Sequence, residues 1–377
     1  MNKFTIEEST PQHANPLLLN RRHWLKAATG VIAAVSSLRA QSEVAVSLPL
    51  QLSINENPFG PSAKAIDAMQ QTMARSYRYP HAQAQQLIDA ISKKENVPTD
   101  HILLGVGSGE ILLAAGRYFG EKKGEVIAAV PGYTQLIDAM KSAGGSAVLV
   151  PVNDQWQHDL DAMATKISEK TSCIYLCNPN NPTATVCDTA KLTAFVIEAA
   201  KKVPVFIDEA YLECADDFAE RTLVGLVTAG HDVIVSRTFS KIYGLAGLRI
   251  GYAVAKPSLL APIKELMTGN PNLLGMVAAH ASLLDHDYCE RTRLQIKAGR
   301  DAVNSVLQQL GRKFTASQTN FVFFHTGIPI DRFQELMKKE QIHVARPFPP
   351  MLDWCRITIG LPDEMKLINQ ALRKILS

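Results

Sequence analysis

The chain has 377 residues, of which 46% are hydrophobic and 20% charged, and its formal net charge is +3. This length and composition are typical of a globular protein of about two domains with a large core. The small net charge argues against a nucleic-acid-binding protein, because such chains carry a basic stripe interleaved with aromatic residues.

Residues 1–40 differ from the rest of the chain. A polar lead contains the paired Arg21 and Arg22, and a small apolar run, residues 27–38, follows it. That run is shorter than the roughly 20 residues that span a bilayer, and the pattern fits a cleaved export signal. The arginine pair resembles a twin-arginine signal, although Trp24 departs from that pattern. We therefore expect a periplasmic protein without a stable membrane span. The alternatives are a packed N-terminal helix and a cytoplasmic location.

The six cysteines are scattered, and two of them, Cys173 and Cys177, lie in the apolar stretch C-I-Y-L-C. Apolar surroundings predict mostly buried free thiols, although an exported protein could also form disulfides. The sequence has no C-x-x-C pair and no H-x-x-x-H set, so it gives no sign of a zinc site.

From residue 102 onward, apolar strands alternate with helices, after an extended N-terminal segment and a first helix over 62–75. The predicted strands are 102–105, 126–130, 147–152, 174–177, 205–208, one that begins at 233, and 248–254. The predicted helices are 111–119, one that follows residues 131–133 and ends at about 142, and 189–201. Near-continuous apolar strands separated by helices predict an α/β fold with a mostly parallel sheet covered on both faces.

The C-terminal part predicts a second, smaller α/β unit. Its helices are expected at 292–310, at 331–339 and at the C-terminus, with strands at 320–325, 342–345 and 356–360. We expect residues 43–75 to join residues 292–377 in this small domain, and residues 76–291 to form the large domain.

Polar residues gather where the predicted strands end, which is where ligands of parallel sheets bind. Lys241 follows two hydroxyl residues, Thr238 and Ser240, and precedes Arg249 by eight residues. The planar fork of an arginine and short hydroxyl hydrogen bonds suit an anion. A phosphate beside a lysine amine is what a pyridoxal-phosphate Schiff base needs. The alternative is a surface lysine in a polar turn.

Two further clusters point to the same chemistry. Ser108 and the glycines around it precede a helix, so that backbone N–H groups could bind a phosphate. Asp208 ends an apolar strand and should be partly buried, and a buried carboxylate needs a cationic partner. A protonated pyridine nitrogen would be such a partner.

Six motifs together resemble a known family. N-E-N-P, R-Y-P, G-x-G-S-x-E, N-P-N-N-P-T, D-E-A-Y and R-T-F-S-K-x-x-G-L-A-G-L-R-I-G occur in this order. They look like the fold-type I pyridoxal-phosphate aminotransferases of class I and II, closest to the histidinol-phosphate aminotransferase group. The resemblance runs from about Leu52 to the C-terminus.

The resemblance implies a role for each matching residue. Lys241 would form the Schiff base with pyridoxal 5'-phosphate and then move a proton, and Asp208 would pair with the pyridine nitrogen. Tyr133 would stack on the ring, while Asn181 and Tyr211 would bind its hydroxyl. The implied phosphate ligands are Ser108, the Gly109 backbone, Thr238, Ser240, Arg249 and, from the neighbouring subunit, Tyr79. A homodimer with shared active sites is therefore expected.

The substrate side is less defined. Arg356 begins C-R-I-T-I-G and would bind the substrate α-carboxylate through its planar fork, unless it forms a structural salt bridge. Asn57 and Arg346 are also expected to contact substrate, although P-F-P-P-M-L-D-W after Arg346 departs from the family pattern. The histidinol-phosphate group usually has a tyrosine just before N-E-N-P, and here no tyrosine precedes Asn55.

We therefore expect transfer of an amino group between an L-amino acid, or a histidinol-phosphate-like amine, and a 2-oxo acid. Aromatic or imidazole side chains are favoured by analogy alone. A pyridoxal-phosphate decarboxylase or lyase is the alternative, because the cofactor serves all of these reactions. A non-catalytic sensor that binds the cofactor and regulates transcription is a third reading, but it would need a DNA-binding domain.

Overall fold

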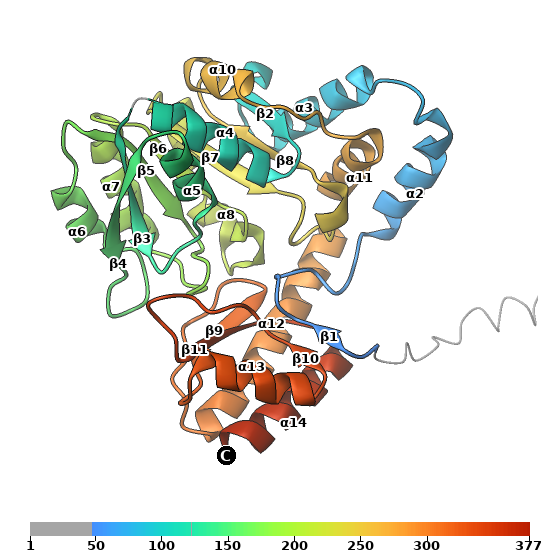
Figure 1. Ribbon diagram of the computed structural model, residues 1–377. Coiled ribbons are helices and arrows are strands. Elements are labelled where there is room, and N and C mark those ends of the chain that lie inside the picture. Colours follow the sequence, from blue (N-terminus) through green and yellow to red (C-terminus); the bar gives the residue numbers. More distant parts are fainter. Residues whose placement is uncertain (1–46, 122) are drawn as a thin grey trace, which may run out of the picture. The chain divides into compact units, whose positions relative to one another are not determined.

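A computed structural model describes residues 47–121 and 123–377 (Figure 1). The predicted export signal, residues 1–40, lies outside the described residues and stays a prediction. Within the described ranges, no helix combines the length and the apolar character that crossing a membrane requires.

The centre of the fold is a seven-stranded sheet with the strand order β2-β8-β7-β6-β5-β3-β4. β8 is antiparallel to both of its neighbours, β2 and β7, whereas the pairs among β3 to β7 are parallel. This arrangement confirms the predicted mostly parallel sheet. The strands are β2 Ile102–Gly105, β3 Glu125–Val130, β4 Ser146–Pro151, β5 Thr171–Cys177, β6 Val205–Asp208, β7 Val233–Thr238 and β8 Gly251–Val254.

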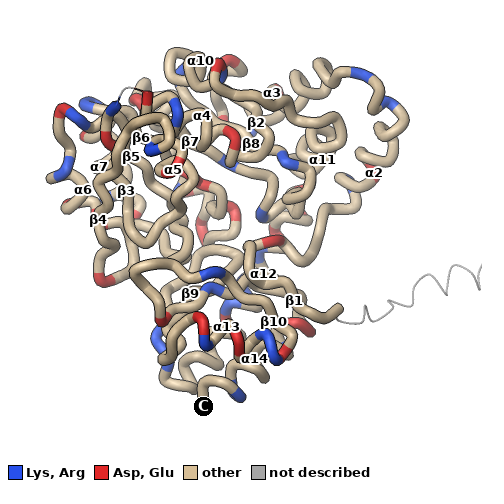
Figure 2. The backbone as a smooth tube through the Cα atoms, in the orientation of Figure 1, with Lys and Arg blue, Asp and Glu red and all other residues tan. Residues whose placement is uncertain are grey.

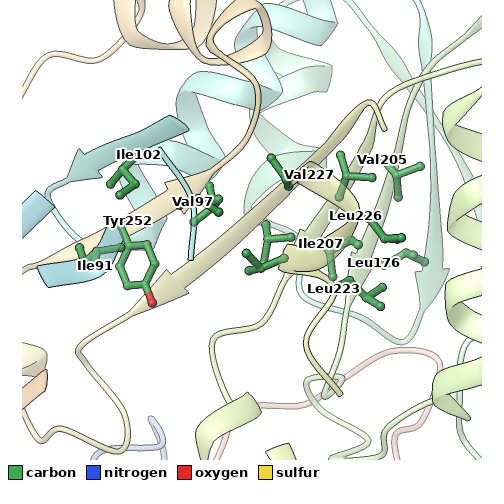
Figure 3. Close-up of a cluster of buried hydrophobic side chains, with 14 of the residues drawn as sticks. Ile91, Val97, Ile102, Leu176, Val205, Ile207, Leu223, Leu226, Val227 and Tyr252 are labelled. Carbon is green, nitrogen blue, oxygen red and sulfur yellow. The ribbon is translucent and has the colours of Figure 1, made fainter. Parts of the chain in front are cut away.

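Helices cover both faces of this sheet because side chains alternate along each strand. In β6, Val205 and Ile207 belong to one apolar cluster, and Phe206 between them belongs to the other. Figure 3 shows part of the first cluster, in which the strand residue Val205 lies near Leu226, and the strand residue Tyr252 lies near Ile91. Fully burying one such side chain stabilises the fold by about 1.5–3 kcal/mol.

Most helix residues of the first cluster come from α3 His81–Glu95, α7 Thr189–Ala200, α9 Val224–Thr228 and α11 Leu273–Leu283. The second is completed by α4 Ser108–Glu121, α5 Gln135–Ser142 and α10 Pro257–Glu265. The remaining helices before the C-terminal part are α2 Ala63–Thr72, α6 Leu160–Thr165 and α8 Phe218–Arg221.

The C-terminal part pairs with the N-terminal segment. β9 Phe321–His325 is antiparallel to β11 Trp354–Thr358, and β1 Leu50–Gln51 is parallel to β10 Ile342–His343. The helices of this part are α12 His286–Gln309, α13 Ile330–Lys339 and α14 Pro362–Leu376. The domain boundaries expected after residues 75 and 291 stay predictions, and the second of them falls inside α12.

Two predicted boundaries shift for local reasons. β8 begins at Gly251 and not at residue 248, because Arg249 has a left-handed backbone conformation with φ of 54° that a strand cannot include. α12 begins at His286 and not at residue 292, because its first turn is polar and shows no apolar periodicity.

The cysteines are free thiols, and all except the partly buried Cys289 are buried, which confirms the prediction for most of them. Figure 2 shows acidic and basic residues interspersed over the helices, in keeping with the small net charge of +3.

Candidate active site

A cavity of about 870 Å³ lies at the edge where β2, β3, β5, β6 and β7 end. Because β8 runs in the opposite direction, its first residues reach the same edge, where Gly251 lies opposite Gly105 and Thr238. Most of the predicted site residues line this cavity: Ser108, Gly109, Tyr133, Asn181, Asp208, Tyr211, Thr238, Ser240, Lys241, Arg249, Arg346 and Arg356.

One end of the cavity is built to hold an anion. The Thr238 hydroxyl donates to Ser240 Oγ over 2.9 Å, and Arg249 Nη1 lies 3.4 Å from the same oxygen. The α4 N-terminus begins at Ser108, so its free N–H groups and helix dipole face this end. Gly107 has φ of 74°, and a Cβ there would lie 2.3 Å from Arg249 Nη2. Only glycine therefore lets the arginine approach the loop this closely.

Asp208 lies at the centre of the cavity edge and is 2% exposed. Its Oδ1 accepts a hydrogen bond from Ser236 Oγ over 3.0 Å, and the Tyr175 hydroxyl lies 3.5 Å from Oδ2. Burial raises the pKa of Asp208 to about 6, although these bonds oppose it. Among the described residues, no cation forms an ion pair with this carboxylate. The site therefore fits a bound group with a protonated ring nitrogen, which would supply the missing charge.

Lys241 places its amine close to the backbone of the N-terminal segment. Its Nζ donates to Asn55 O over 3.0 Å, with Ile54 O at 3.5 Å, and lies 5.2 Å from the centre of the Tyr211 ring. Burial and then the charge of Arg356 lower the pKa of Lys241 to about 8. A lysine with this pKa is partly neutral near physiological pH, which a nucleophile or proton carrier requires.

Arg356 lines the same cavity. Its Nη1 donates to Asn181 Oδ1 over 2.6 Å, and Nη2 donates to Ser53 O over 2.6 Å. Its Nε is buried and has no partner among the described residues. Because none of these contacts is a carboxylate, the predicted alternative of a structural salt bridge finds no acidic partner in the described ranges. An unpaired N–H at a cavity is a ready donor to a carboxylate.

Two tyrosines, Tyr133 and Tyr211, also line the cavity. The Tyr133 hydroxyl donates to Gln135 Oε1 over 2.8 Å, and burial raises its pKa to about 12. The Tyr211 hydroxyl accepts from Asn55 Nδ2 over 3.0 Å, and burial likewise raises its pKa. Tyr211 therefore stays protonated and keeps its own hydrogen available to donate.

Two predicted site residues do not line the cavity. Asn57 uses its side chain structurally, because Nδ2 donates to Ile242 O over 2.8 Å and Oδ1 accepts from the Phe59 N–H over 3.0 Å. Tyr79 is 88% exposed. Its expected contact is with the phosphate of a neighbouring subunit, and that contact stays a prediction.

Glu110 was not among the predicted site residues, although it belongs to the G-x-G-S-x-E motif. Its Oε2 accepts from the Val106 N–H over 2.7 Å, and its Oε1 accepts from Gly269 over 2.6 Å and from Thr268 over 3.2 Å. This carboxylate therefore ties the segment before α11 to the glycine loop. Its place in a shared motif, close to a helix start, was the signal that could have revealed it.

A buried ion network behind the cavity was also missed. Arg237 is 3% exposed and contacts Glu209 over 2.9 Å and Glu95 over 3.1 Å. Lys94 contacts Glu213 over 3.1 Å, and the Tyr252 hydroxyl donates to Glu95 over 2.7 Å. Although burial alone would raise it, the pKa of Glu95 is lowered by Arg237 and Lys94. Arg237 directly precedes Thr238, and Glu209 directly follows Asp208, so the network fixes two strands that carry site residues.

The chain matches known proteins over nearly all of its described length. The family model of class I and II aminotransferases matches residues 49–375. The histidinol-phosphate aminotransferase of Moorella thermoacetica is 34% identical over 344 residues, which is 89% of this chain and 88% of that protein. The chain therefore belongs to the class I and II aminotransferase family.

Solved structures agree with this assignment. The histidinol-phosphate aminotransferase of Sinorhizobium meliloti in complex with pyridoxal-5'-phosphate has a TM-score of 0.80 at 27% identity, and the match covers 88% of this chain and 91% of that one. The L-threonine-O-3-phosphate decarboxylase of Porphyromonas gingivalis has a TM-score of 0.75 at 19% identity, with 87% and 99% covered, and shares the fold alone. The protein is a pyridoxal-phosphate-dependent aminotransferase, and pyridoxal 5'-phosphate is its cofactor.

Proposed function

We propose that this enzyme moves an amino group between an L-amino acid and a 2-oxo acid. The observation that carries the proposal is that the Lys241 amine and the unpaired Nε of Arg356 belong to one cavity with an anion-binding end. An α-amino acid needs both a proton carrier at its α-carbon and a donor for its carboxylate. Because the cofactor phosphate would occupy the anion-binding end, the Lys241 amine and the Arg356 Nε remain available to the substrate.

In this proposal, pyridoxal phosphate supplies the electron sink that stabilises a carbanion at the substrate α-carbon. Asp208 would keep the ring nitrogen protonated, and the Tyr211 hydroxyl and the Asn181 amide would bind the ring hydroxyl. The phosphate ligands are Ser108, the Gly109 backbone, Thr238, Ser240 and Arg249, which together line the anion-binding end. Tyr133 would pack against the ring.

Lys241 and Arg356 then act on the substrate. The Lys241 Nζ, whose pKa is about 8, is partly neutral near physiological pH and would take up and return the proton of the substrate α-carbon. Arg356 fixes the α-carboxylate, so that the bond broken at the α-carbon is the one to hydrogen. Holding the carboxylate in a charged hydrogen bond disfavours its loss as carbon dioxide.

The choice of amino donor is the finer part of the proposal. Relatives are named for histidinol phosphate, an amine with an imidazole ring and a phosphate. Arg346 lines the cavity near Arg356 and could meet a distal anion of that kind or of an acidic amino acid. We therefore place histidinol phosphate among the donors to be tested, beside the common L-amino acids. If the predicted export signal acts, the reaction takes place outside the cytoplasm.

The test uses the visible absorbance of the cofactor in the purified enzyme. We expect at least one amino donor to bleach the wild-type enzyme and a 2-oxo acid to restore the colour, because transamination stores the amino group on the cofactor. Lys241→Ala should lose this response entirely. Release of carbon dioxide without lasting bleaching would favour a decarboxylase, whose fold this chain shares.

We also propose that the enzyme is a homodimer in which Tyr79 reaches the phosphate of the partner's cofactor. An aromatic residue that is 88% exposed near the start of α3 supports this, because large exposed apolar groups often mark interfaces. The expected mass in solution is twice that of the chain, and Tyr79→Phe should release the cofactor faster. A monomer that retains its cofactor would contradict the proposal.

A further inference from the structure

The charged side chains around the cavity can be assigned one by one. Asp208 is assigned to the cofactor ring nitrogen, Arg249 belongs to the anion-binding end, and Arg356 has an unpartnered Nε for the substrate carboxylate. Glu110 lines the cavity as well, but its two oxygens accept three backbone N–H groups. These groups therefore have partners or clear roles.

Two charged side chains are left over, Glu56 and Arg346. Both line the cavity and both are exposed. Arg346 donates to Pro347 O over 2.9 Å and lies 4.7 Å from the centre of the Phe348 ring. The Glu56 carboxylate forms no ion pair and no hydrogen bond within the described ranges. It lies close enough to Lys241 to raise the pKa of that amine, although burial and Arg356 outweigh it.

The backbone that carries Glu56 is held firmly at the cavity. Asn55 O accepts from Lys241 Nζ and from Asn320 Nδ2, each over 3.0 Å, and Glu56 O accepts from Asn320 over 3.2 Å. The Asn55 N–H donates to Thr358 Oγ1 over 3.0 Å. Because these bonds fix the main chain, Glu56 presents its carboxylate from a defined place beside the reactive amine.

Asn55 has a left-handed backbone with φ of 59°, which is uncommon for a residue other than glycine. Its side chain turns inward to the Tyr211 hydroxyl, while its two neighbours, Ile54 and Glu56, both line the cavity. Ile54 is 61% exposed there. Strained backbone held by its surroundings is typical of functional positions. Here it offers one apolar and one anionic side chain to whatever enters the cavity.

We propose that Ile54 and Glu56 form the subsite for the distal part of the amino donor, and that Glu56 selects donors with a cationic distal group. Ile54 contacts the aliphatic stem, and the carboxylate of Glu56 accepts from the group at its end. Arg346 serves acidic partners in the same space. With both residues, the site could accept side chains of either charge in turn. The inference rests on the proposed transamination.

The experiment compares paired donors that differ only at the distal group, L-lysine with L-norleucine and L-arginine with L-citrulline. The rate of bleaching per molar donor gives a charged-to-neutral ratio for each pair with holoenzyme. Glu56→Gln should lower this ratio on the order of tenfold, the usual effect of a hydrogen bond to a charged group. Glu56→Asp keeps the charge and should retain most of the ratio.

Glu169→Gln is the matched control. Glu169 is exposed and precedes β5, and the carboxyl end of β5 lines the cavity. The Glu169→Gln variant therefore loses the same charge as Glu56→Gln, but at the end of the strand away from the cavity. It should leave both ratios unchanged. The inference is overturned if Glu56→Gln leaves the ratios at their wild-type values, or if it slows both members of each pair equally.

The outcome is separate from that of the proposed function. If no donor bleaches the wild-type enzyme, transamination of these amino acids fails. The two ratios are then taken from dissociation constants measured by calorimetry with the same pairs. A tenfold fall in Glu56→Gln would still support the subsite, and an unchanged ratio would still overturn it.

Discussion

Asp208→Asn is expected to make the cofactor-free protein more stable and the enzyme nearly inactive. The Asp208 carboxylate is 2% exposed and, in the described residues, it has no ion-pair partner. Its pKa of about 6 lies above the ordinary value of 3.8 because of burial. The folded protein therefore carries an unfavourable charge at neutral pH, and a neutral amide of the same shape removes it.

The sign of the pH dependence follows from the raised pKa. Above about pH 6 the carboxylate is charged in both folded and unfolded chains, so the full burial cost is present. As the pH falls from 6 towards 4, the folded protein takes up the proton first and the cost disappears. Asp208→Asn should gain about 1–2 kcal/mol of unfolding free energy at pH 7, after some loss in its bond from Ser236. The gain should fade below pH 5.

Urea unfolding of the cofactor-free variants at several pH values measures this. Asp154→Asn changes an exposed aspartate and serves as the control. In the same variant we expect turnover to fall on the order of 100-fold or more, because a charge placed for the reaction is lost. A destabilised Asp208→Asn at pH 7, or one with ordinary turnover, would contradict the role of Asp208.

Arg237→Met is expected to have the largest effect on stability. The arginine donates to Glu209 through Nε and Nη2 over 3.0 and 2.9 Å, and to Glu95 over 3.1 Å. These side chains are almost fully buried. Removing the cation leaves the buried Glu209 without an ion-pair partner and leaves Glu95 with Lys94 alone, at 3.6 Å. Breaking a buried pair in this way costs about 3–5 kcal/mol.

Arg237→Lys separates charge from geometry. Lysine keeps the positive charge but cannot donate from a planar fork to both carboxylates, so an intermediate loss is expected. The double variant Arg237→Met with Glu209→Gln should lose less than the sum of the two single changes, because the two residues interact directly. Thermal unfolding of the holoenzyme, followed by circular dichroism, provides the comparison. A loss below about 1 kcal/mol in Arg237→Met would show that the network adds little.

Much of the fold was predictable because its strands are short apolar runs with clear ends. β6 is an example: V-F-I-D was predicted as a strand over 205–208, and the structure has Val205–Asp208. The left-handed turn at Arg249 was not predictable, because arginine rarely adopts that conformation and nothing local in the sequence requires it. The true start of β8 was missed for that reason.

The site shows the same division. A single sequence indicates which residue types gather at strand ends, and the cavity contains most of those predicted. It does not show pairs between distant segments. Arg356 meets Asn181 across 175 residues, and Asn55 meets Tyr211 across 156. The position of Glu56 at the cavity depends on contacts of this kind, which bring the N-terminal segment beside Lys241.

The reversed direction of β8 has a consequence for how the anion-binding end is encoded. Along the parallel strands, each contributor to the cavity edge follows its own strand and comes from a different region of the chain. Because β8 returns beside β7, Thr238 at the end of β7 and Ser240, Lys241 and Arg249 in the connection to β8 lie within one short stretch, residues 238–249. Recombination between related genes could exchange residues 238–249 as one unit. It would carry the reactive amine together with Thr238, Ser240 and Arg249, and leave Ser108, Gly109 and the substrate side to the rest of the chain.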